Sequence, residues 1–234
     1  MKASSYSGLL LTLGNRGDVY VDWTCRNSAL VFADAYFDAA RTLIEHFRNS
    51  PPHAFQTIPV IFLLRHYTEL ALKECIFQSL VLAKTVDPSY NHGAQLGAIL
   101  KEHNLSRLLK ILSGLNRFSR TTDDSADVPF LSSKCVGFIE ELNQCDPTST
   151  WFRYPKNKTL EFPPARAFNL GVLLSGMEQV RDELTELSGS TEVTSDQINE
   201  YLNHYADDAN YGQMKWTWTW KVELLKALCL INLK

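Results

Sequence analysis

Apolar side chains recur at helical spacing along most of this chain. Positions i, i+3, i+4 and i+7 share one face of an α-helix, so apolar residues at these positions predict a helix that packs on a core. Leu105, Leu108, Leu109 and Leu112 follow this spacing. The same criterion predicts helices over residues 28–48, 58–84, 104–116, 133–144, 164–187 and 195–209. We therefore expect an all-α helical bundle.

Prolines and small polar residues predict where the helices begin and end. Pro51 and Pro52 end the first helix, because proline cannot continue one. Pro164 suits the first turn of the helix over residues 164–187, and Gly189 follows its expected end. Polar or proline-rich composition predicts loops over residues 119–129, 146–164 and 188–196.

Strand-like alternation is confined to two short segments, residues 18–23 and 216–220. If extended, the second segment places Trp216, Trp218 and Trp220 on one face. Residues 224–231 again have a helical pattern. We expect a helical bundle with at most a small β element, forming a single domain over residues 1–234. Its parts are an N-terminal helix at 28–48, a core motif region at 58–187 and a C-terminal extension at 195–234.

Composition excludes several classes of protein. The 234 residues are 45% hydrophobic and 21% charged, as in ordinary globular proteins. The net charge of −3 argues against a generally basic nucleic-acid-binding protein, so binding of that kind needs a local basic patch. The five cysteines form no CxxC pair, and we expect reduced thiols, no metal and no cofactor. No apolar run approaches the ~20 residues that span a bilayer, and no signal peptide is recognisable, so we expect a soluble cytoplasmic protein.

The mostly apolar segment 58–84 contains a line of charges. Arg65, Glu69 and Lys73 lie at i, i+4 and i+8, and His66 is next to the first of them. Opposite charges at this spacing pair along a helix, and a charge in an apolar helix is costly unless it is paired or solvated. One interpretation is a structural line of ion pairs between helices. The other is a cleft that binds an anion or a nucleotide.

A second candidate region is the loop 146–158, in which aromatic and basic side chains alternate. It contains Trp151, Phe152, Arg153, Tyr154, Lys156 and Lys158. Aromatic rings stack on bases and cations bind phosphates, so this pattern suits single-stranded nucleic acid. Alternatively, the aromatic residues close the end of the bundle and Arg153 caps a helix or meets a carboxylate.

Three segments together resemble a group of bacterial HEPN-like helical proteins. They read FLLRHYTELALKECI, HNLSRLLKIL and FIEELNQCDPTSTWFRYP, which matches an RHxxELxLK helix, an HxL helix start and an FRYP loop over roughly residues 58–156. By this resemblance Arg65, His66, Glu69 and Lys73 take the central-helix positions. His103 takes the HxL position, and Arg153, Tyr154 and Pro155 take the FRYP positions.

The resemblance implies an all-α fold, a homodimer and a role in bacterial defence or a toxin–antitoxin system, with RNA or a nucleotide as ligand and an antitoxin or operon product as partner. Many HEPN proteins are metal-independent RNases, and others bind RNA or nucleotides without catalysis. The nucleases use an Arg-x4-6-His motif near the start of a late helix. Here Arg41 and His46 have that spacing in the first helix, and Arg48 and His53 have it across two prolines. Neither pair takes the family's place.

Two functional hypotheses are consistent with these features. In the first, the protein is an RNA-binding protein or endoribonuclease in which His103 or His66 is the base and Arg153 or Arg65 stabilises the phosphorane. Its binding residues would be Arg65, Glu69, Lys73, Trp151, Tyr154 and Lys156. In the second, it is a non-catalytic interaction or dimerisation module with a structural line of ion pairs. A metal hydrolase is disfavoured, because the chain lacks a repeated Glu-x-x-His motif.

The tryptophans of residues 216–220 generate a prediction about association. Burial of apolar surface stabilises a protein by about 25 cal/mol for each Å² removed from water, so three large rings on one face are expected to be covered. We expect a second copy to cover them, with a lid over the bundle's own end as the alternative. Light scattering should show a dimer for the wild type and a monomer for a Trp216→Ala, Trp218→Ala double variant. A wild type that is monomeric at tens of micromolar would leave only the lid.

Overall fold

The computed structural model describes residues 29–50, 52, 54–86, 98–119, 130–153 and 167–191 of the chain. Within these residues the chain is helical and contains no strand, which confirms the predicted all-α bundle. The elements are α1 (Ala29–Asn49), the 3-10 helix η1 (Ala54–Thr57), α2 (Ile58–Val86), α4 (Leu105–Ser119), α5 (Ser133–Cys145) and α6 (Leu170–Thr191).

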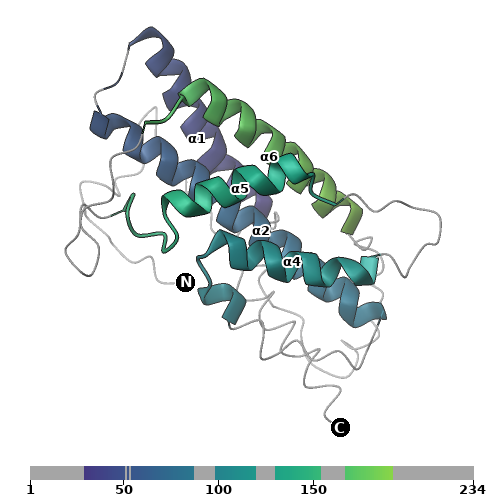
Figure 1. Cartoon of the computed structure of the whole chain (residues 1–234). Helices are drawn as coiled ribbons and strands as arrows, with labels where there is room; N and C mark the ends of the chain where they lie inside the picture. The colour runs from purple at the N-terminus through teal and green to yellow at the C-terminus, as the bar shows by residue number, and fades with distance from the viewer. Residues whose placement is uncertain are drawn as a thin grey trace, which may run out of the picture.

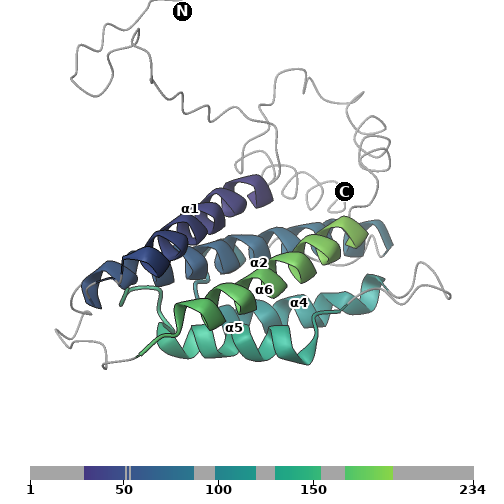
Figure 2. The same ribbon diagram turned by 90° about the horizontal axis from the view of Figure 1, so that it is seen from above.

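Helix α2 is the centre of the bundle. It packs against α1, α4, α5 and α6, while α1 contacts α6, α6 contacts α5, and α5 contacts α4. Figures 1 and 2 show this arrangement, with α1 and α4 on different sides of α2. Because neighbours cover α2 along much of its circumference, its apolar residues are not restricted to one stripe. Val60, Leu64, Leu72, Ile76 and Leu80 are all fully buried.

The surrounding helices are amphipathic, as their sequence pattern predicts. In α1, Ala33, Phe37, Ala40 and Ile44 are buried at intervals of three or four residues. The leucines of α4 and the apolar residues of α6 follow the same rule and join one continuous core. The polar faces of these helices point outward. Burial of these apolar faces against α2 is the main stabilising contribution to the bundle.

Side-chain caps fix where the later helices begin. Ser132 Oγ accepts a hydrogen bond from the Cys135 amide at the start of α5, at 3.1 Å. The same hydroxyl donates to Glu183 of α6 at 2.8 Å, which ties the two helices together. Asn169 Oδ1 accepts from the amides of Gly171 and Val172 at 3.0 and 3.1 Å, and so caps α6.

The predicted helices at 28–48, 58–84, 104–116 and 133–144 are confirmed, with ends within a few residues of those expected. For the helix predicted over residues 164–187, both ends were wrong. Helix α6 begins at Leu170, where Asn169 caps it, and continues through Gly189 to Thr191. Residues 18–23, 195–209, 216–220 and 224–231 lie outside the described part of the chain. Among the described helices, none has the length and hydrophobicity to cross a membrane.

A close contact between α5 and α6 generates a stability prediction. A Cβ atom added at Gly176 would overlap with Cε2 of Phe138, so Gly176→Ala must displace that ring. We expect a loss of about 1–3 kcal/mol in the free energy of unfolding, as for other overpacked sites. Gly114→Ala in α4 is the matched control, because no atom lies within 4 Å of the added Cβ.

The control should gain about 0.5–1 kcal/mol, since alanine is the better helix former. Denaturant unfolding of the two variants should therefore shift in opposite directions. Equal shifts would show that the Phe138 ring moves aside at no cost.

Candidate functional site

The charged line of α2, which we call the charged stripe (Arg65, Glu69 and Lys73), is buried. Its side chains face a seam between α2 and two loops, residues 102–104 before α4 and residues 146–153 after α5. Arg65, Glu69 and Lys73 are only 1%, 2% and 5% exposed. The charged stripe therefore lies in a seam between elements, as in the interpretation of a structural line of ion pairs.

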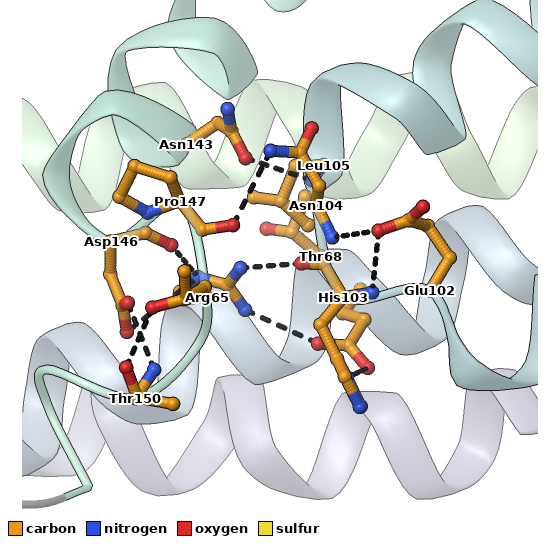
Figure 3. A network of polar contacts seen from close by, with 12 residues as sticks. Arg65, Thr68, Glu102, His103, Asn104, Leu105, Asn143, Asp146, Pro147 and Thr150 are labelled. Atoms are coloured by element: carbon orange, nitrogen blue, oxygen red, sulfur yellow. Dashed lines mark hydrogen bonds and ion pairs between the residues drawn. The ribbon is translucent and has the colours of Figure 1, made fainter. Parts of the chain in front are cut away.

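Arg65 joins both loops to the central helix (Figure 3). Its Nε donates to the carbonyl oxygen of Asp146 at 3.0 Å, and its Nη2 donates to the carbonyl oxygen of His103 at 2.6 Å. Nη1 donates to Glu69 Oε2 at 3.2 Å. Burial lowers the pKa of Arg65, and the negative charges of Asp146 and Glu69 oppose that shift. One guanidinium thus holds two chain segments that are far apart in sequence.

Glu69 is the common acceptor of the stripe. Its Oε1 accepts from Lys73 Nζ and contacts His103 Nδ1, each at 2.8 Å. Burial alone raises the pKa of Glu69, but the hydrogen bonds and positive charges of Lys73 and His103 outweigh it and lower that pKa overall. An ionised carboxylate only accepts hydrogen bonds, so Nδ1 of His103 must carry the proton. In the neutral ring, Nε2 is then the basic nitrogen.

The two loops also hold each other. Asn104 Nδ2 donates to the Pro147 carbonyl at 3.3 Å, and Asn143 Oδ1 accepts from the Leu105 amide at 2.9 Å (Figure 3). Within the second loop, Asp146 Oδ1 accepts from the Thr150 amide at 2.9 Å. These contacts hold the backbone that leads into α4 and out of α5, next to the segment that contains His103.

His103 differs from the stripe because it reaches the surface. Its side chain is 47% exposed, while its partner Glu69 is buried. Nε2 has no hydrogen-bond partner among the described residues. A half-exposed imidazole oriented by a buried carboxylate is the arrangement of a general base with its orienting group.

His66 does not join His103. Its ring stacks on Phe62, with centroids 5.6 Å apart and an interplanar angle of 10°, and the ring of Tyr36 meets it edge-on at 4.5 Å. Its Nδ1 is buried without a hydrogen-bond partner. Burial lowers the pKa of His66; the charge of Glu69 opposes this shift, and the charges of Arg153, Lys73 and Arg65 add to it. His66 therefore acts as a packing residue in its neutral form.

The remaining candidate residues belong to the loop 146–158, of which residues 146–153 are described, and they differ in their surroundings. The Arg153 side chain is exposed, and its guanidinium lies 5.2 Å from the ring centroid of Phe62. Arg153 is therefore beside the charged stripe and not within it. Trp151 is half-buried, and Phe152 packs on the core and meets Phe168 at 6.4 Å. Phe152 thus fits the interpretation that aromatic residues close the bundle. The other two candidates of this loop, Tyr154 and Lys156, lie outside the described residues.

Other reactive groups are separate from this site. Burial raises the pKa of the Cys75 and Cys135 thiols to about 12, so neither is a thiolate at neutral pH. Arg41, from the Arg-x4-6-His match in α1, pairs with Asp38 at 2.9 Å. Among the described residues, no three His, Cys, Asp or Glu side chains group as metal ligands.

Comparisons with protein-family models, with curated proteins and with solved structures found no match. A function can therefore be inferred only from the geometry of the site and from the sequence. Sequence reasoning missed the residues that complete the site, which are Asn104 and Asp146 of the two loops and Asn143 of α5. Only Asn104 had a usable signal: an asparagine directly before a leucine-rich helix is a preferred N-cap, and its Oδ1 accepts from the Arg107 amide at 3.0 Å.

The buried pairing of Glu69 generates a stability prediction. Glu69→Ala leaves Arg65 and Lys73 buried without their carboxylate, and breaking such a pair costs about 3–5 kcal/mol of unfolding free energy. Glu45→Ala, at an exposed position of α1, is the matched control and should stay within about 0.5 kcal/mol of wild type. Thermal and urea unfolding measure both. An unchanged melting temperature for Glu69→Ala would contradict the buried network.

Proposed function

We propose that this chain is a HEPN-like RNA-binding protein with metal-independent endoribonuclease activity, acting in bacterial defence or a toxin–antitoxin system. The observation that carries the proposal is the pair of His103 and Glu69. The buried carboxylate holds Nδ1 at 2.8 Å, and Nε2 lies on a half-exposed ring. The resemblance of residues 58–156 to HEPN proteins supplies the substrate class, RNA.

In the proposed reaction, Nε2 of His103 accepts the proton of a ribose 2′-hydroxyl. The 2′-oxygen bonds to the adjacent phosphorus, the bond from phosphorus to the 5′-oxygen breaks, and the leaving 5′-oxygen takes a proton from water. The products are a 2′,3′-cyclic phosphate and a 5′-hydroxyl. Glu69 keeps the imidazole in the right tautomer and stabilises its protonated form. Catalysis of this kind uses no metal.

Arg153 is the candidate for stabilising the negative charge of the phosphorane. Its side chain is exposed, and its loop is held beside the His103 loop by Arg65. Arg65 is less suited to this role, because three of its donors already bind protein acceptors. His66 is less suited as the base, because its ring is enclosed by Phe62 and Tyr36.

One observation favours a second candidate, a non-catalytic helical interaction module. Arg65 and Lys73 direct their hydrogen bonds to Glu69 and to the carbonyl oxygens of Asp146, His103 and Leu100. A stripe that serves only to join α2 to two loops accounts for these contacts without a substrate. Activity measurements separate the two candidates.

The nuclease proposal predicts cleavage of RNA in the presence of EDTA, with 2′,3′-cyclic phosphate ends. His103→Ala should lower the rate by about 100-fold or more, the usual contribution of a general base. Arg153→Ala should lower it by a similar factor, since it removes charge stabilisation. His46→Ala, at an exposed histidine of α1, is the matched control and should keep full activity.

His66→Phe should also keep its activity if the variant folds, because that ring only packs. Product ends are identified by treatment with a phosphatase that opens cyclic phosphates. Wild type that leaves RNA intact under all conditions would favour the interaction module. Equal cleavage by His103→Ala and wild type would overturn the assignment of the base.

A further inference from the structure

Exposed basic side chains gather on α4 and just before it. This helix contains no aspartate or glutamate, although the whole chain has a net charge of −3. Arg107 and Lys110 are exposed on it one turn apart, and Lys101 is exposed just before the His103 loop. We call these three side chains the α4 basic face. The leucines of α4 point the other way, into the core.

Glu102 connects this face to His103. Its Oε1 accepts from the amides of His103 and Asn104 at 3.0 and 2.9 Å, and its Oε2 pairs with Arg107 at 3.3 Å. The same carboxylate therefore holds the His103 backbone and the first cation of α4. Arg107 is still 74% exposed in this pair, so its guanidinium can also bind a ligand. Lys101 and Lys110 have no ion-pair partner among the described residues.

We propose that the α4 basic face binds the phosphate backbone of single-stranded RNA, so that the strand runs along α4 and ends over His103. This inference rests on the proposed function and adds the path of its substrate. Cations without acidic neighbours on the same helix attract a polyanion, and backbone contacts of this kind carry no sequence preference. Arg107 and Lys110 are separated by a rise of about 4.5 Å along the helix, so adjacent phosphates can bind them in turn.

The test measures binding apart from cleavage. Fluorescence anisotropy records the affinity of a 2′-O-methyl oligonucleotide, which cannot be cleaved by 2′-hydroxyl attack, at several salt concentrations. For Arg107→Ser, Lys110→Ser we expect at least a tenfold weaker affinity at low salt. The slope of log K against log salt should fall by about 1.4, since each phosphate contact to a single strand contributes about 0.7.

Arg41→Ser, Arg48→Ser is the matched control. It removes the same charge from α1, which lies away from α4 in Figure 2, and its affinity and salt slope should stay close to those of wild type. Thermal unfolding checks that both double variants fold, which we expect because all four side chains are at least partly exposed. Equal losses in the two double variants would overturn the inference, since net charge alone would then explain binding.

The remaining outcomes separate this inference from the proposed function. If wild type binds and cleaves RNA but the α4 variant binds it unchanged, the path along α4 is wrong and the nuclease proposal stands. If wild type binds no RNA, both fail. If poly-glutamate binds the α4 face as tightly as RNA does, the face is a site for an acidic protein, and the RNA path is overturned.

Discussion

The arrangement of the site depends on one buried guanidinium. Arg65 is surrounded by protein, and such a charge is stable only where hydrogen bonds and opposite charge replace water. The carboxylates of Asp146 and Glu69 provide the charge, while the carbonyl oxygens of Asp146 and His103 complete the shell. Because carbonyl oxygens belong to the backbone, satisfying Arg65 also fixes the course of two loops. The electrostatic requirement of one side chain thereby sets the geometry of the surface above it.

Glu69 connects the buried charges of the seam to the exposed His103. It accepts hydrogen bonds from Arg65 and Lys73 inside the seam and binds His103 at its outer edge. The hydrogen bonds and charges of Lys73 and His103 outweigh the effect of burial and lower the pKa of Glu69, which favours its ionised form. An ionised carboxylate in turn fixes the tautomer of His103. The pairing that stabilises the seam therefore also orients the exposed imidazole.

The sequence predicted the helices of the described residues and, as one of two interpretations, the pairing along α2, and the reasons for both are local. Apolar spacing specifies which face of a helix is buried, and the four-residue spacing of Arg65, Glu69 and Lys73 places their side chains in contact. The partners in the loops could not be predicted, because a backbone carbonyl has the same chemistry at every residue. The start of α6 was misplaced for a related reason: Pro164 and Asn169 both suit a helix start, and only the structure shows the Asn169 cap in use.

The basic residues of the described chain divide into a buried set and an exposed set, and this division is consistent with the proposed binding of a polyanion by an acidic chain. Arg65 and Lys73 have their charge compensated inside the protein and contribute little field outside it. Arg153, Arg107 and Lys110 are exposed, and of these three only Arg107 forms an ion pair among the described residues, with Glu102. The exposed cations belong to the loop 146–153 and to α4, and Arg65 binds the backbone of that loop and of the segment that precedes α4. A net charge of −3 therefore says little about this surface, because binding responds to the local field and not to the sum over the chain.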